Sequence, residues 1–353
     1  EHIGTFFASG GDDGRAILWE FKGHKFVSKS QDIFNNAYGS GDAMPILDQE
    51  DFKNQETDPD HDKVEVREDG KQRKSGGIIK VSTIKFLSII IPFLGITDLT
   101  WAPDSLHFAT CGTDSRICIM NINEGAPLKI LDSKANGLTF DPFGKFLASQ
   151  SSEEKSVKIW RVQNFKNITE ATQISSYFKQ SMGMSINRRL SWSSDGSFIS
   201  ATGGRIQGEY VVPLIERSSW NLMACLSGHS SSINISRINQ RLYKYKEGTD
   251  LNCYSIVAIV SQDSTISVWK PQLEKPFALI MDFSMMGVTD LSWGFNGNIL
   301  LSSSHDGKVS AFHFQPGILG EPLSEFEKRE IISRRYGNQV LQDYIKNAST
   351  TSQ

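Results

Sequence analysis

The stretch FFASGGDDGRAILWEF, residues 6–21, places three glycines and two aspartates between two apolar segments. Such a composition suits a loop that cradles a phosphate or a cation, and it equally suits a tight turn between two β-strands. The first interpretation predicts a protein that does chemistry at this loop. The second predicts an all-β protein in which the loop is only a turn.

The same pattern recurs along the chain. Each copy has a short apolar strand, a polar turn and an alternating strand. In every copy an acidic residue precedes a large apolar residue by six positions. The copies are the opening stretch (Asp13, Trp19), HFATCGTDSRICIMNI at 107–122 (Asp114, Met120), FLASQSSEEKSVKIWRV at 146–162 (Glu154, Trp160), SIVAIVSQDSTISVWKP at 255–271 (Asp263, Trp269) and NILLSSSHDGKVSAFHF at 298–314 (Asp306, Phe312). Five matches at one spacing indicate an internal repeat.

A second element precedes most copies. It reads LTWAPDSLHF from Leu99, LTFDPFGKFL from Leu138, LSWSSDGSFI from Leu190 and LSWGFNGNIL from Leu291. An apolar strand, turn residues such as Asp-Gly or Asn-Gly and another strand form the pattern of a β-hairpin. Trp101 and Phe140 are 39 positions apart, and Asp263 and Asp306 are 43 apart. This period predicts the four-stranded blades of a WD40 β-propeller, so the fold class is all-β.

Six blade signatures divide the chain. We expect a partial blade over residues 1–22, a polar and disordered insertion over 23–77, propeller blades over 78–316 and a helical exit segment with a tail over 317–353. The insertion is dense in charge and poor in apolar residues. Ser324 followed by Glu327 is a capping-box pattern and predicts the start of a short C-terminal helix.

The repeat explains most of the conspicuous residues as structural. We expect the turn carboxylates to accept hydrogen bonds from turn amides and the large apolar residues to pack one blade on the next. In one copy a histidine joins the aspartate and the tryptophan in a buried polar network. These structural residues are Asp13, Trp19, Asp114, Glu154, Trp160, His229, Asp263, Trp269 and Asp306.

Composition and motifs argue against several classes of function. The chain has 37 Lys and Arg against 40 Asp and Glu, so bulk charge does not favour nucleic-acid binding. The four cysteines form no CxxC pair, which argues against zinc. Residues 58–69 resemble a calcium loop, but a lysine replaces its glycine and the final glutamate is missing. The apolar part of 78–96 is too short for a bilayer. We therefore expect no catalytic, cofactor-binding or metal-binding residue, and no enzyme.

One basic pair stands apart from the repeat. In NRRLSW, Arg188 and Arg189 directly precede an inner strand, where the entering loop lies near the central channel of a propeller. Arginine is common at protein interfaces because its planar fork binds carboxylates in bidentate fashion. A contact with a partner protein is one interpretation of this pair, and an ordinary surface ion pair is the other.

Longer segments resemble the amino-terminal propeller of the Hir/HIRA histone-chaperone subunits. The resemblance covers residues 96–340 well and 1–22 moderately. It rests on NGLTFDPFGKFLASQSSEEKSVKIWRV (136–162), RRLSWSSDGSFISA (188–201), VVPLIERSSWNLMACLSGH (211–229) and GVTDLSWGFNGNILLSSSHDGKVSAFHF (287–314) with LGEPLSEFEKREIISRRYG (319–337). The last run is the most specific. The family has seven blades, and this sequence lacks the first blade and the opening strands of the second.

This resemblance implies a nuclear, non-catalytic scaffold in a complex that deposits histones H3 and H4 independently of replication. In fungal members it also implies repression of histone genes. The implied partners are a ubinuclein-like or Hpc-type subunit and, through the complex, the histones. We expect no membrane association and no direct sequence-specific DNA binding. The alternatives are the WD40 subunit of the replication-coupled chromatin assembly factor and a generic WD40 adaptor.

Overall fold

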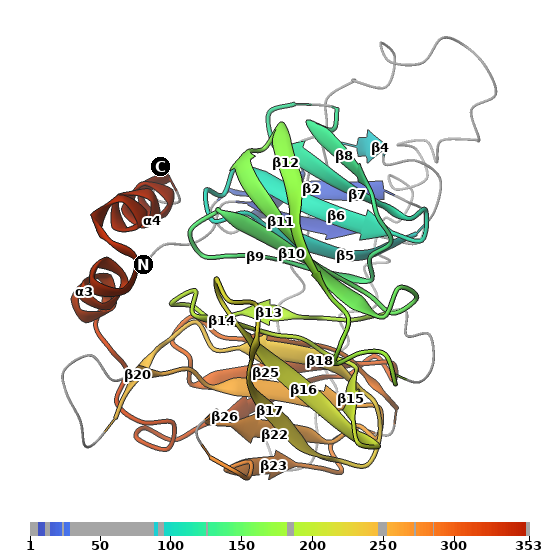
Figure 1. Cartoon of the computed structure of the whole chain (residues 1–353), viewed down its shortest axis with the longest axis vertical. Coiled ribbons are helices and arrows are strands. Elements are labelled where there is room, and N and C mark those ends of the chain that lie inside the picture. Colours follow the sequence, from blue (N-terminus) through green and yellow to red (C-terminus); the bar gives the residue numbers. More distant parts are fainter. Residues whose placement is uncertain are drawn as a thin grey trace, which may run out of the picture. The chain divides into compact units, whose positions relative to one another are not determined.

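The computed structural model describes residues 6–10, 15–22, 25–28, 88–90, 95–124, 126–181, 187–245, 253–271, 273–284 and 286–350. In these residues the regular structure consists of antiparallel β-sheets followed by two helices (Figure 1). The predicted all-β propeller class is confirmed. All elements from the fifth strand onward belong to one compact unit that contains Ile89–Gln353.

The N-terminal strands form a sheet of their own. It contains β1 (Phe6–Gly10), β2 (Arg15–Lys22), β3 (Lys25–Ser28) and β4 (Ser88–Ile90), with the order β1-β2-β3 and β4 paired with β2. Trp19 lies on β2 opposite Ser28, whereas Asp13 lies outside the described residues. Apart from β3, the predicted insertion 23–77 also lies outside them.

Two regular blades follow in chain order, and each has four strands in meander order. The first, blade A, contains β5 (Ile96–Trp101), β6 (His107–Gly112), β7 (Arg116–Asn121) and β8 (Lys129–Asp132). The second, blade B, contains β9 (Gly137–Phe140), β10 (Phe146–Ser151), β11 (Ser156–Asn164) and β12 (Asn167–Ile174). Their short polar turns carry the repeat pattern seen in the sequence.

Three further blades depart from this regular form. Blade C has five strands, β13 (Ser191–Trp192), β14 (Phe198–Ser200), β15 (Gly204–Ile206), β16 (Glu209–Glu216) and β17 (Leu222–His229). Blade D has β18 (Ile233–Ile238), β21 (Val257–Ser261), β22 (Ile266–Trp269) and β23 (Ala278–Ile280), with the hairpin β19 (Tyr243–Lys244) and β20 (Cys253–Tyr254) inserted after β18. Blade E has three described strands, β24 (Val288–Trp293), β25 (Ile299–Ser304) and β26 (Val309–His313).

The hydrophobic core is divided among the interfaces between successive blades. Buried Trp160 of blade B shares a cluster with residues of blade A, and buried Trp192 of blade C shares one with residues of blade B. Trp269 of blade D lies in the cluster shared with blade C, and Trp293 of blade E in the cluster shared with blade D. Full burial of one aliphatic side chain in these clusters contributes roughly 1.5–3 kcal/mol, so neighbouring blades stabilise one another.

Two helices close the described chain, α3 (Glu325–Tyr336) and α4 (Asn338–Thr350). Ser324 caps α3, and its reciprocal hydrogen bonds with Glu327 confirm the predicted capping box. The sequence predicted one short helix in this segment, whereas the described residues after 317 form two. Gly337, at a φ of 84°, ends α3 and separates it from α4. No helix in the described part of the chain is long and apolar enough to cross a membrane.

Candidate protein-interaction site

A polar network joins the last strand of blade C to blade D. Trp269 donates its indole N–H to Ser267 Oγ over 2.7 Å, and His229 Nε2 lies 2.7 Å from the same oxygen. Burial lowers the pKa of His229, and nearby Asp263 opposes this shift. Asp263 itself accepts hydrogen bonds from the backbone N–H of Thr265 and the hydroxyl of Ser230. This network therefore links His229, at the end of β17 in blade C, to Ser267 and Trp269 on β22 of blade D.

The other residues predicted as structural make local contacts. Trp160 is 7% exposed and donates its indole N–H to Ser149 Oγ over 2.9 Å. The remaining carboxylates contact their own turns: Asp114 accepts from Arg116 N, Asp306 accepts from Lys308 N and Ser304 Oγ, and Glu154 pairs with Lys158. For Trp19 the structure describes the backbone position, which lies on β2.

Charged residues in or next to the inner strands of four blades form one network. Arg189, which precedes β13, pairs with Asp98 of β5 and lies 3.4 Å from Asp290 of β24. Arg237 of β18 donates to the same Asp290 over 3.0 Å. Burial raises the pKa of Asp98, which also accepts the N–H of Leu138, and Arg189 and Arg237 oppose this shift. Because these residues come from blades A, C, D and E, the network links non-adjacent blades.

Arg188 lies beside this network but is buried. It is only 2% exposed, and its guanidinium donates to Asn234 Oδ1, Ile233 O and Ser181 Oγ over 3.3–3.5 Å. Burial lowers its pKa to about 10. The prediction of a partner contact is therefore wrong for Arg188, because the chain itself covers the side chain. Arg189 keeps 18% of its side chain exposed, so for this residue a partner contact stays a prediction.

A second arginine, whose side chain is 9% exposed and which the sequence did not single out, lies where the helices meet the blades. Arg217, between β16 and β17, binds Asp141 of blade B over 2.7 Å. Four aromatic rings surround its guanidinium with centroids within 5.5 Å: Phe143, Phe146, Trp192 and Tyr336. Tyr336 belongs to α3, so this arginine joins two blades and a helix. The sequence did not reveal this contact, because the residues that surround Arg217 are far apart along the chain.

Further contacts fasten the two helices to the blades. Arg335 of α3 pairs with buried Asp195 in the turn between β13 and β14. Asp343 of α4 pairs with Lys145 of blade B over 2.7 Å. Buried Ile331 of α3 shares an apolar cluster with residues beside the β19–β20 hairpin. The helical exit segment is therefore an integral part of the folded unit, and Figure 1 shows both helices on one side of the blades.

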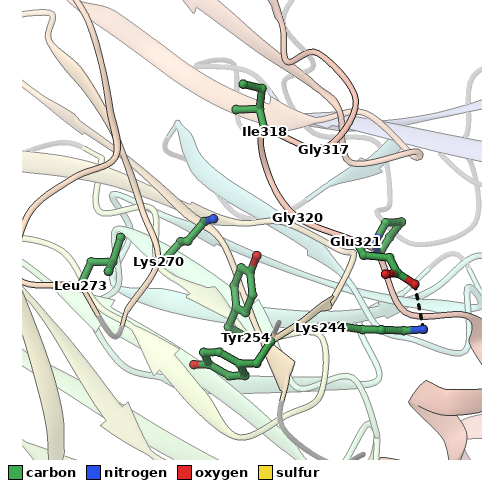
Figure 2. A pocket seen from close by; sticks show the side chains of 10 residues that line it. Lys244, Tyr254, Lys270, Leu273, Gly317, Ile318, Gly320 and Glu321 are labelled. Carbon is green, nitrogen blue, oxygen red and sulfur yellow. Dashed lines mark ion pairs between the residues drawn. The ribbon is translucent and has the colours of Figure 1, made fainter. Parts of the chain in front are cut away.

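A surface groove of about 830 Å³ lies beside the β19–β20 hairpin, the turn after β22 and the segment that leads to α3. Figure 2 shows Lys270 and Leu273 on one side of it and the ion pair of Lys244 with Glu321 on the other. Tyr254 stands between them. The sequence did not reveal this groove, because its walls come from an insertion in blade D and from the exit segment.

The walls of the groove are held by specific contacts. The Tyr254 hydroxyl donates to Leu319 O over 2.8 Å. Gly320 has a φ of 114°, and a Cβ added there would overlap with the Tyr254 hydroxyl, so only glycine fits. Lys244 also binds Glu327 of the capping box over 2.8 Å. The groove is thus built on a fixed turn of the exit segment.

Comparison with known proteins gives the family of the chain. The model of the WD domain, G-beta repeat, matches residues 93–121, 125–161 and 283–313. Protein HIR1 of Mycosarcoma maydis is 31% identical over 248 residues, which are 69% of this chain and 23% of the relative. Protein HIR1 of Cryptococcus neoformans is 32% identical over 265 residues (73% and 29%), and protein hir1 of Schizosaccharomyces pombe is 31% identical over 252 residues (69% and 26%).

These alignments span about a quarter of the length of the curated relatives, and they cover more than two thirds of this chain. The WD matches fall on blade A, on the strands from β8 to β11 and on blade E. Sequence, repeat and fold agree. The chain belongs to the Hir family of WD40-repeat proteins.

Proposed function

We propose that this chain is a non-catalytic protein-interaction scaffold of a nuclear Hir-type histone-chaperone complex. In this proposal the complex deposits histones H3 and H4 independently of DNA replication and represses transcription, histone genes included. The observation that carries the proposal is the identity of about 30% to proteins named HIR1 over more than two thirds of the chain. A fold alone does not imply a function, so the family match carries more weight than the propeller.

The structure supports a scaffold rather than a catalyst. The titratable residues that the repeat singles out are engaged in hydrogen bonds within turns or between strands, such as His229 with Ser267. Among the described residues, no group of three or more His, Cys, Asp or Glu side chains is placed to hold a metal ion. A rigid set of blades with a fastened exit segment suits the presentation of surfaces to other proteins.

The partners follow from the same proposal. A ubinuclein-like or Hpc-type subunit would bind the propeller, and histones would reach it through the complex. The net charge of −3 does not favour direct binding to DNA. The segment EPLSEFEKREI contains the capped start of α3. Its resemblance to Hir-type proteins supports a Hir-type complex rather than the replication-coupled chromatin assembly factor.

The test is affinity purification of the tagged full-length protein from nuclease-treated nuclear extract, with mass spectrometry of the proteins that co-elute. Recovery of H3 and H4 together with Hir-type subunits is the expected result. Recovery of the large subunit of the replication-coupled factor would replace the proposal with its alternative. An untagged extract controls for non-specific binding, and recovery of neither set would overturn both assignments.

A further inference from the structure

The segment that connects blade D to blade E lies between two short turns. β22 pairs with β23 as far as Ile280, so the chain leaves blade D beside the turn between β21 and β22. In that turn the Ser264 hydroxyl donates to Met286 O over 3.3 Å. The Ser284 hydroxyl, in the connection itself, lies 3.5 Å from Asp306 in the turn between β25 and β26. The connection is therefore fastened to both turns.

Large apolar side chains at this end of blade D stay exposed. Met281 is 58% exposed, Leu279 is 55% exposed and Met286 is 53% exposed. Leu279 and Met281 are two positions apart, so they lie on the same face of the extended chain. Single exposed apolar residues are ordinary, but a group of them is typical of a surface that binds a partner. Methionine suits such a surface because its side chain adapts to the shape that it contacts.

Two exposed carboxylates accompany these apolar side chains. Asp263 accepts the backbone N–H of Thr265 over 2.9 Å and the hydroxyl of Ser230 over 3.1 Å, and both donors are neutral. Asp282 directly follows Met281 in the chain and is exposed. Among the described residues, neither carboxylate forms an ion pair with a lysine or an arginine. Both negative charges therefore face solvent without a cation opposite them.

The lysine beside the β25–β26 turn does not neutralise them. Lys308 binds Asp306 over 3.2 Å, so these two charges cancel each other. The surface thus keeps the negative charges of Asp263 and Asp282. It would repel nucleic acid or an acidic peptide and attract a cationic segment. Charge and exposed apolar area together define what can bind here.

We infer that this surface, formed by Asp263, Leu279, Met281, Asp282 and Met286 and here called the blade D tip, binds a short segment of a second protein in which a Lys or Arg lies next to a large apolar residue. The apolar side chain would pack on Met281 and Met286, and the cation would lie against Asp282. That the owner of the segment is a subunit of the Hir-type complex rests on the function proposed above.

The first measurement selects peptides without assuming a partner. A library of random 12-residue peptides displayed on phage is panned on the full chain. Phage that also bind the double variant Met281→Ser with Asp282→Asn are removed. We expect a consensus in which Lys or Arg adjoins Leu, Ile, Met, Phe or Trp. An acidic consensus, or no consensus, would overturn the inference.

The second measurement uses the synthetic consensus peptide in fluorescence polarisation. Met281→Ser and Met286→Ser should each weaken binding about fivefold or more, because each removes apolar area that the peptide covers. Ile318→Ser is the control, since Ile318 is 53% exposed, as Met286 is, but lies outside the blade D tip; it should leave affinity within about twofold. Equal losses in Met286→Ser and Ile318→Ser would contradict binding at the tip.

The charge is tested separately. Asp282 has a φ of 59°, which asparagine tolerates, so Asp282→Asn removes the charge with little strain. It should weaken binding several-fold and flatten the dependence of affinity on salt. Glu274→Gln is the matched control, because Glu274 is an exposed carboxylate at the opposite end of β22 and β23, and it should keep both. An unchanged salt dependence in Asp282→Asn would overturn the inference. Thermal unfolding of every variant separates lost binding from lost folding.

The final step separates this inference from the proposed function. The consensus is searched for in the subunits recovered by affinity purification, and each matching peptide is tested with the same variants. If Hir-type subunits co-purify but none carries a segment that binds the blade D tip, the docking inference fails and the proposed function stands. If the segment that binds belongs to a subunit of another complex, the docking surface stands and the Hir assignment fails.

Discussion

Two arginines of this propeller keep little of their side chains exposed, and the protein accommodates their charges in opposite ways. Arg217, under the helices, has the carboxylate of Asp141 and a box of four aromatic rings. Arg188, just before an inner strand, is more deeply buried, yet its described hydrogen bonds go to neutral oxygens. The first arrangement pairs a charge, and the second only solvates it.

The difference shows where the fold depends on charge. Asp141 is fully buried; burial raises its pKa and Arg217 opposes the shift, so removal of the arginine would leave an unpaired carboxylate in the interior. For Arg188, burial alone lowers the pKa to about 10, which means that the folded state pays to keep this cation. Arg217 should therefore be indispensable for stability and Arg188 replaceable by an apolar side chain.

The largest effect should come from Arg217→Met. The variant leaves Asp141 without its cation and removes the guanidinium that contacts blade B, blade C and α3. We therefore expect a loss of about 3–5 kcal/mol in the free energy of unfolding. Denaturant titration measures it. Arg205→Met is the control, because Arg205 lies on the same blade over the ring of Tyr210 and is only half-buried; it should cost less than about 1 kcal/mol. Equal losses of stability in the two variants would contradict a special role of Arg217.

A glycine gives the next largest effect, this time in the Arg188 region. Gly203 has a φ of 67°, and a Cβ added there would overlap with the guanidinium of Arg188. Gly203→Ala should cost about 2–4 kcal/mol, from the strained backbone and the overlap together. Gly208→Ala is the matched control: its φ of 90° is also positive, but no atom lies within 4 Å of the added Cβ. The difference between the two variants isolates the overlap.

Arg188→Met should change stability by no more than about 1 kcal/mol, because it removes a buried cation together with three long hydrogen bonds. Ile233 O keeps the N–H of Gly203 as a donor, so it is not left unsatisfied. In the double variant with Gly203→Ala, the methyl group no longer overlaps with a guanidinium. Part of the stability lost in Gly203→Ala should therefore be regained, and a double-mutant cycle measures this coupling. A loss above about 3 kcal/mol for Arg188→Met alone would show that an anion partners this arginine.

The same two regions show what sequence patterns can predict. The repeat of Asp263 and Trp269 and the capping box at Ser324 act within one hairpin or one helical turn, and such local geometry is encoded by spacing. The pairing of Asp141 with Arg217 joins residues 76 positions apart, and no local pattern contains it. For Arg188, the pattern predicted a position next to an inner strand but not the burial of the side chain, because neighbouring chain segments create that burial. The groove depends in the same way on an insertion and a distant exit segment meeting in space.

The smallest effect concerns the helix that covers Arg217. The hydrogen bond from Lys244 is the main cause, and those from Ser324 the next, of a Glu327 pKa lowered to about 2 from its usual 4.5. A lowered pKa in the folded state means that the contact stabilises α3 above pH 4.5 and is lost as the pH falls from 4.5 towards 2. We therefore expect helical circular dichroism to decrease slightly over this range, ahead of global unfolding.

The variant Glu327→Gln should remove that pH-dependent decrease, because glutamine keeps the capping geometry without the charge. Glu325→Gln is the control, since Glu325 lies in the same turn but outside the capping box; it should leave the decrease in place. Tyr336 of the same helix completes the ring box, so early loss of α3 should also loosen the site of Arg217 and leave Arg188 untouched. Simultaneous exposure of both arginines with falling pH would contradict the independence of the two regions.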